Sequence, residues 1–136
     1  MKKSSRRRFL ALAAGLSAIS TAFPMLRHRK LVNGKQIAHH VFFWLKNPTS
    51  TEDRDNLIAG VKTLSAIETV REIHIGVVAE TEKRPVVDAS WHVSELIFFD
   101  DLQGQTTYQS HQVHLDFVKK YSPLWEKVIV YNAKEV

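Results

Sequence analysis

The chain has 136 residues, with 19 Lys and Arg against 14 Asp and Glu, and it contains no cysteine. The excess of positive charge is confined to residues 1–30, which hold eight Lys and Arg and no acid, so residues 31–136 carry eleven basic and fourteen acidic side chains. A slightly acidic body without a basic, aromatic-interleaved patch argues against nucleic-acid binding. The absence of cysteine excludes disulfides and thiolate metal sites.

The first thirty residues have the composition of an export signal. A basic start precedes an apolar segment at residues 9–23, which is shorter than the roughly 20 apolar residues needed to span a bilayer. Residues 5–10, Ser-Arg-Arg-Arg-Phe-Leu, resemble the twin-arginine signal; an ordinary secretory signal is the alternative. We therefore expect residues 1–30 to be an export signal and linker that the twin-arginine translocase reads, with the folded protein delivered to a bacterial periplasm.

The remaining residues are expected to form one domain that begins with a strand. Residues 37–46 are rich in aromatic and β-branched side chains and stop before Asn47-Pro48, which is typical of a strand and its end. Because neither face of this strand is polar, both faces should be covered by other parts of the protein. One face bears His39, Val41, Phe43 and Leu45, and the other bears His40, Phe42 and Trp44.

A helix and two further strands are predicted next. Ser50 and Asp53, three residues apart, approximate a capping box, and an apolar stripe extends the helix from about Thr51 to Ala66. Residues 71–78 and 90–99 alternate as strands. One face of the later strand is expected to bear Trp91, Val93, Ile97 and Phe99.

Asp100-Asp101 predict the start of a second helix, which should break near His111 and end at Ser122-Pro123, before a last strand at residues 126–133. The order βαββαβ is that of a ferredoxin-like α+β fold, with helices on one face of a four-stranded antiparallel sheet. The bare opposite face predicts a second copy packed sheet on sheet, and therefore a homodimer. The second helix is expected to carry the apolar residues Leu102, Tyr108, Leu115, Phe117 and Val118.

Several residues of the folded part form an ordered set: His39-x-Val41-x-Phe43, Gly76, Tyr108-x-x-His111-x-x-His114-x-x-Phe117 and Trp125. This set resembles one known family, the stress-responsive A/B barrel (Dabb) family, over residues 37 to about 133. The resemblance implies that residues 31–136 are a Dabb domain, a βαββαβ unit that dimerises into an α/β barrel. Gln112 replaces the usual proline of the family, so a softer helix break is expected.

The family is functionally mixed, which leaves several functions open. Some plant members are stress-induced proteins without established chemistry, whereas the plant olivetolic acid cyclase closes a polyketide with a tyrosine and a histidine. The resemblance places that pair at Tyr108 and His114, with His39 lining the same pocket. An imidazole can take a proton α to a carbonyl while a phenol steadies the enolate. The alternative is that both residues serve packing only.

A metal site and a haem site are further alternatives to the acid–base pair. His111 and His114 have the i, i+3 spacing of helical metal ligands, with His39 or His74 as a third, but the His-Glu-x-x-His pattern is absent. A related barrel fold houses haem-degrading enzymes, so haem is a further alternative. We predict neither a metal nor another cofactor.

The sequence therefore predicts an exported homodimer that binds a small apolar or aromatic molecule. His39, His111, Phe43 and Phe117 are expected to contact the ligand, and His114 and Tyr108 are the candidate catalytic pair of a cofactor-free acid–base enzyme resembling polyketide cyclases. A stress-protective protein without ligand chemistry is the other alternative. The wall of the cavity is expected to comprise Phe43, Leu57, Val61, Ile97 and Phe117.

Overall fold

The computed structural model describes residues 35–136; the export signal and linker predicted for residues 1–30 lie outside the described residues. Short 3₁₀ turns at Leu64–Ala66 and Ser122–Leu124 follow the first and last helices. No helix in this part of the chain is long and apolar enough to cross a membrane. The elements are β1 (Ile37–Leu45), α1 (Thr51–Thr63), β2 (Glu72–Gly76), β3 (Val93–Phe99), α2 (Leu102–Ser110), α3 (Gln112–Tyr121) and β4 (Trp125–Lys134).

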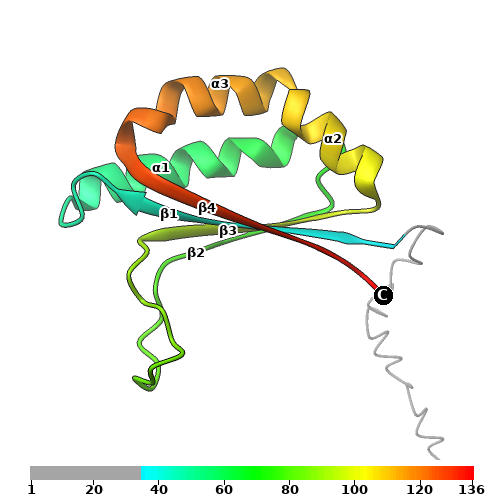
Figure 1. Ribbon diagram of the computed structural model, residues 1–136. Coiled ribbons are helices and arrows are strands. Elements are labelled where there is room, and N and C mark those ends of the chain that lie inside the picture. Colours follow the sequence, from blue (N-terminus) through cyan, green and yellow to red (C-terminus); the bar gives the residue numbers. More distant parts are fainter. Residues whose placement is uncertain (1–34) are drawn as a thin grey trace, which may run out of the picture.

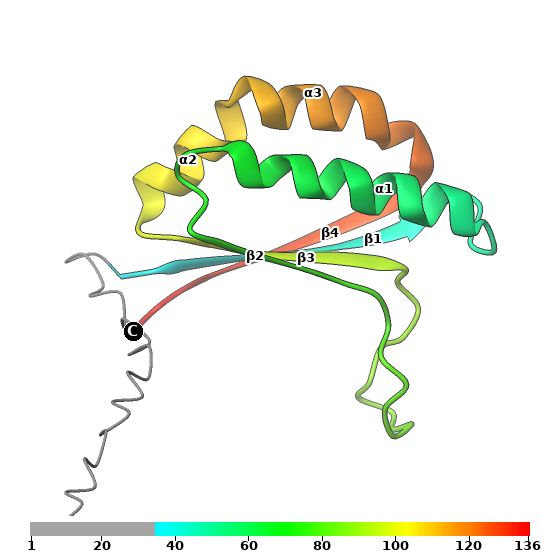
Figure 2. The same cartoon turned by 180° about the vertical axis from the view of Figure 1, so that it is seen from behind.

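The four strands form one sheet in the order β2-β3-β1-β4, and every neighbouring pair is antiparallel. All three helices lie on the same face of this sheet, as the view in Figure 1 and the view from behind in Figure 2 both show. This arrangement confirms the predicted ferredoxin-like α+β fold. The opposite face, which we call the outer face, carries no helix formed by residues 35–136.

Strand β1 lies at the centre of the sheet and is buried at every second residue. Its helix-facing side chains pack on α1, α2 and α3, because alternation places one apolar set of the strand against the apolar stripes of the helices. The buried core comprises Ile37, Val41, Phe43, Leu45, Leu57, Val61, Leu64, Ile67, Val93, Ile97, Phe99, Tyr108 and Phe117.

Side-chain caps begin the helices where the sequence predicts them. The Ser50 hydroxyl accepts a hydrogen bond from the Asp53 amide at 3.1 Å, and the Asp101 carboxylate accepts from the Gly104 amide at 2.8 Å. The predicted break falls at His111, whose extended backbone (φ −65°, ψ 139°) separates α2 from α3. The helix break therefore forms without the proline that Gln112 replaces.

Three large apolar side chains, one before β3 and two in the helices, lie outside the core. Trp91 does not join the Val93 face, because β3 begins only at Val93; its ring packs edge-on against Phe42 of the outer face at 5.1 Å. Leu102 and Leu115, two of the apolar residues on the second predicted helix, are 59% and 49% exposed and do not join the core. Each short helix buries only one stripe, and these two residues lie outside it.

The outer face is apolar across three strands. Its large side chains are half-buried or exposed although most of them are apolar. The segment at residues 77–92, between β2 and β3, projects on this same side of the sheet (Figures 1 and 2). On β1, β3 and β4, the large side chains of this face are His40, Phe42, Trp44, Leu96, Phe98, Lys127, Ile129 and Tyr131, and the small residues Ala38, Ser94 and Ala133 lie among them.

Candidate functional site

A cavity of about 320 Å³ lies on the helix side of the sheet, between α3 and strands β1 and β4. Val128 and Val130 of β4 are 43% and 45% exposed although they lie on this side, because the helices do not extend over the edge strand. The cavity therefore opens along β4. Its apolar lining is Val41, Phe43, Phe117, Val118, Trp125, Val128 and Val130, and its polar lining is His39, Glu95, Gln109, His114 and Ser122.

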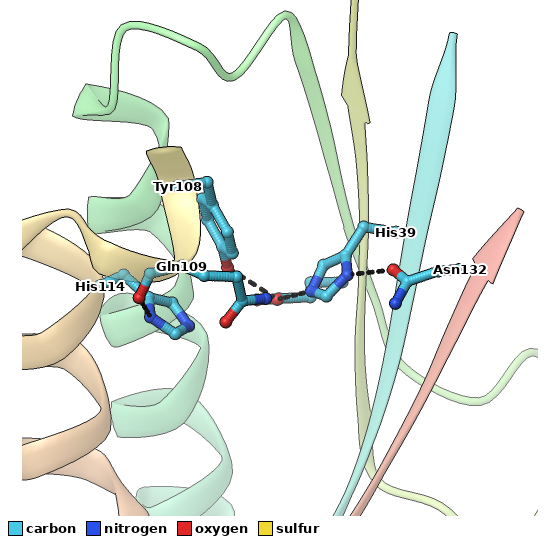
Figure 3. Close-up of polar contacts among 6 residues, drawn as sticks. His39, Tyr108, Gln109, His114 and Asn132 are labelled. Atoms are coloured by element: carbon cyan, nitrogen blue, oxygen red, sulfur yellow. Dashed lines mark hydrogen bonds and ion pairs between the residues drawn. The ribbon is translucent and has the colours of Figure 1, made fainter. Parts of the chain in front are cut away.

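His39 projects from β1 toward the helices and is only 3% exposed. Its Nδ1 lies 2.6 Å from the amide oxygen of Asn132 on β4, as Figure 3 shows. Because an amide oxygen only accepts hydrogen bonds, Nδ1 carries the proton and Nε2 keeps its lone pair. Burial lowers the pKa of His39 and thereby favours the neutral imidazole.

Glu95 is a buried carboxylic acid in the middle of β3, and the sequence reasoning missed it. It is 2% exposed, and its Oε1 accepts a hydrogen bond from the Tyr108 hydroxyl at 3.3 Å and lies 4.0 Å from Nε2 of His39. Its Oε2 is buried without a hydrogen-bond partner among the described residues. Burial raises the pKa of Glu95 to about 7. The alternation of Val93, Glu95 and Ile97 was the signal that places this acid on the helix side.

Tyr108 lies behind the cavity and not in its wall. Its side chain is fully buried, and its ring packs against the rings of His39 at 5.6 Å and His114 at 4.6 Å. Burial, reinforced by Glu95, raises the pKa of the phenol, so the hydroxyl stays protonated. Tyr108 can therefore donate to Glu95, whereas direct contact with a ligand is closed to it in this conformation.

His114 lines the cavity from α3 and is half-buried. Its Nδ1 lies 3.1 Å from the backbone carbonyl oxygen of Gln109, which accepts the Nδ1 proton (Figure 3). Nε2 is consequently the unprotonated nitrogen. Burial lowers the pKa of His114 and keeps the ring neutral near pH 7. A neutral imidazole with a free lone pair beside a cavity can act as a base.

His111 is not among the residues that line the cavity, although the sequence predicts ligand contact for it. Its Nδ1 accepts from the Val113 amide at 3.1 Å and caps α3, while its Nε2 lies 3.3 Å from the Glu68 carboxylate. Both ring nitrogens are thus used in holding the helix break. Its position is that of a capping residue.

Two of the five residues predicted for the cavity wall lie along this cavity. Phe43 and Phe117 line the cavity, whereas Leu57, Val61 and Ile97 are fully buried in the core beside it. The remaining wall comes from β4, through residues such as Val128 and Val130. The hydrophobic pattern of β4 alone could not show which of its faces the helices leave open.

Residues 35–136 contain no group of three or more His, Asp or Glu side chains arranged to hold a metal ion. His111 and His114 turn to different partners after the helix break, and His74 is exposed on β2. The i, i+3 spacing read from the sequence therefore does not bring metal ligands together. The haem alternative is untested and stays a hypothesis.

Comparison with known proteins places this geometry among related folds. The family profile described as "Stress responsive A/B Barrel Domain" (Dabb) matches residues 37–134. A Dabb protein of ferredoxin-like fold from Mesorhizobium loti is 25% identical, with a TM-score of 0.62 over 75% of this chain and 98% of that one. A comparison with curated proteins found no match.

Two more distant structures share the fold. A dimeric ferredoxin-like protein of unknown function from Thermobifida fusca is 16% identical, with a TM-score of 0.62 over 75% of this chain and 92% of that one. The hydroxynitrile lyase of Passiflora edulis is 20% identical, with a TM-score of 0.63 over 75% of this chain and 94% of that one. At these identities the similarity shows the fold alone.

Proposed function

This chain belongs to the stress-responsive A/B barrel (Dabb) family, and from that premise we propose that it binds a small, flat, largely apolar or aromatic molecule between its helices and its sheet. The observation that carries the proposal is the cavity of about 320 Å³, whose wall is mostly aliphatic and aromatic with a few polar tips. Ligand sites commonly have this size and composition. No Lys or Arg lines the cavity, so a phosphate or a sugar acid would find no cationic partner there.

A wall substitution tests ligand binding directly. Val128→Trp should fill the cavity from its open side, because Val128 is 43% exposed at the mouth. Isothermal titration with 2-tetralone, a flat bicyclic ketone, and with tetralin, its oxygen-free analogue, should show binding to the wild type and none to Val128→Trp. The control is Val86→Trp, at a position 84% exposed and outside the cavity. If the wild type binds neither compound, the proposal fails and the stress-protective alternative is favoured.

An acid–base enzyme is the second candidate function, and the free Nε2 of His114 favours it. The Passiflora edulis protein of the same fold is a hydroxynitrile lyase, so the fold is compatible with enzymatic activity. Because Tyr108 lies behind the wall of the cavity, only one member of the predicted catalytic pair would contact the ligand. His114 would face the ligand, and Tyr108 would act through its hydrogen bond to Glu95. The candidate reaction class is proton abstraction next to a carbonyl group.

Replacement of His114 separates catalysis from packing. His114→Ala should lower the exchange of α-hydrogens of 2-tetralone in D₂O, followed by proton NMR, by roughly 10²–10⁴-fold, the usual loss on removing a general base. Its melting temperature should change little, because the ring is half-buried at the edge of the cavity. A large drop in melting temperature with unchanged exchange would instead assign His114 to packing.

The active assembly that we propose is a homodimer joined through the outer face. Phe42, Trp44 and Phe98 leave large apolar surfaces of the sheet in water in a single copy, and a second sheet packed face to face would cover them. The Thermobifida fusca protein of this fold is described as dimeric, which supports the same assembly here. The cavity lies on the other side of the sheet and stays open in this arrangement.

Export through the twin-arginine route is also proposed, on the strength of residues 5–10, which lie outside the described residues. Replacing Arg6 and Arg7 together with lysine should retain the precursor in the cytoplasm, because that route reads the arginine pair. The matched control replaces Lys2 and Lys3 with arginine and should leave export unchanged. Normal periplasmic amounts of the first variant, measured by cell fractionation, would favour an ordinary secretory signal.

A further inference from the structure

The two oxygens of the Glu95 carboxyl group are in different situations. Oε1 accepts the hydrogen bond of the Tyr108 hydroxyl at 3.3 Å, whereas Oε2 is buried and has no hydrogen-bond partner among the described residues. Glu95 is one of the residues that line the cavity, so its carboxyl group lies beside the space that a ligand would fill. A buried polar atom without a partner loses its hydration without compensation, and an acceptor or donor supplied by a ligand would remove that cost.

We propose that protonated Glu95 donates a hydrogen bond from Oε2 to a carbonyl oxygen of the ligand, and so selects an aromatic or alicyclic ketone or aldehyde for this cavity. This inference rests on the proposed ligand-binding function and names the substrate class of that site. The polar end of the ligand lies at Glu95, and its apolar body lies along Phe43, Phe117 and Trp125.

Burial favours the acid form of Glu95, and the hydrogen bond from Tyr108 opposes this effect without cancelling it. His39 on β1, Tyr108 on α2 and His114 on α3 face it or the cavity beside it, and Asn132 on β4 fixes the tautomer of His39. None of these side chains is a fixed cation, and burial raises the pKa of Glu95 to about 7. The 4.0 Å between Oε1 and His39 Nε2 is too long for a hydrogen bond, so the proton is not shared with His39. Because Oε1 already accepts the hydrogen bond of the Tyr108 hydroxyl, we assign the carboxyl proton to Oε2.

The same contact completes an enolisation when His114 is the base. The C–H bond next to the carbonyl breaks, its proton passes to Nε2 of His114, and its electron pair forms the C=C bond of the enol. The carbonyl oxygen takes the proton of Glu95, which becomes a carboxylate. In D₂O the proton on Nε2 of His114 exchanges for a deuteron of the solvent. Transfer of this deuteron to carbon and of the enol O–H proton back to Glu95 regenerates the ketone. The net result is exchange of an α-hydrogen, and no oxidant or co-reactant is required.

The ratio of two affinities tests the proposal. Isothermal titration of the intact wild-type protein between pH 5 and pH 9 should show 2-tetralone binding about 3–10-fold more tightly below pH 7 than above it, the range expected for one hydrogen bond. Tetralin has no oxygen, so its affinity should not change with pH. A 2-tetralone affinity that is as independent of pH as that of tetralin overturns the proposal, even if Glu95 variants fail to fold.

Two substitutions separate a hydrogen-bonding role from a structural one. Glu95→Gln keeps an N–H donor at every pH, so its preference for 2-tetralone over tetralin should persist without pH dependence, while α-hydrogen exchange falls because an amide cannot transfer the proton. Glu95→Leu should abolish the preference at every pH. If either variant binds the two compounds with the wild-type ratio and pH profile, Glu95 does not contact the carbonyl oxygen. If the wild-type protein binds neither 2-tetralone nor tetralin, the ligand-binding function itself is refuted.

Discussion

At the scale of single residues, burial of Glu95 makes the stability of the fold depend on pH. Its pKa rises from 4.5 to about 7 in the folded chain because burial disfavours the carboxylate. The unfolded chain releases this proton near pH 4.5 and the folded chain only near pH 7. The stability contributed by the protonated group is therefore fully present below pH 4.5 and is lost as the pH rises through 7. At about 1.4 kcal/mol per pKa unit, the loss is about 3 kcal/mol.

Glu95→Gln should remove this dependence. Relative to the wild type, the free energy of unfolding of the variant should rise by about 3 kcal/mol between pH 4.5 and pH 7.5, measured by urea denaturation. Burial lowers the pKa of His39, His40 and His114, which gives both proteins the opposite slope and cancels in the difference. A difference that does not change with pH would show that Glu95 titrates normally in the folded chain.

At the scale of secondary-structure elements, helix α1 approaches Tyr121 so closely that only glycine fits at residue 60. A Cβ atom on Gly60 would lie 2.6–2.8 Å from carbons of the Tyr121 ring. Tyr121 is the last residue of α3. Alanine would otherwise favour the helix by up to about 1 kcal/mol. We expect Gly60→Ala to destabilise the fold by about 1–3 kcal/mol, because the overpacked helix pair must separate.

Gly104→Ala in α2 is the matched control, since its Cβ would meet other atoms only at 3.5–3.6 Å. Thermal denaturation should show a lowered melting temperature for Gly60→Ala and an unchanged or higher one for Gly104→Ala. Tyr121→Ala in addition to Gly60→Ala removes the clash, so the two changes together should cost less than their sum. Equal stability of the two single variants would mean that α1 and α3 are not packed through this contact.

At the scale of the whole molecule, the outer face decides the assembly. Trp44→Glu would place a charge between two sheets, at a cost of several kcal/mol when it is buried without a partner. Light scattering at micromolar concentration should therefore give the mass of a dimer for the wild type and of a monomer or an aggregate for the variant. Leu102→Glu, at a site 59% exposed on the helix layer, should remain dimeric. A wild-type mass of one subunit would end the dimer proposal.

The order of elements could be predicted because its signals are local. Alternation in residues 37–46, the caps at Ser50 and Asp101, and the break at His111 each depend on neighbouring residues only. The positions of Phe43 and Phe117 beside the cavity also follow from local patterns, because the strand and helix periods turn both side chains toward the space between helices and sheet. Glu95 lay within reach of that reasoning, because the alternation of β3 turns it inward.

The sequence by itself determined the ferredoxin-like fold of the described residues and the Dabb family, since both depend on periodic patterns and on an ordered set of residues along the chain. Only the tertiary structure decided the composition of the site. It turned His111 to Glu68, placed Tyr108 behind the wall and left Oε2 of Glu95 without a partner. The reason is physical: hydrogen-bond partners, desolvation and the free space beside a side chain are set by elements distant in the sequence, and local patterns do not encode them.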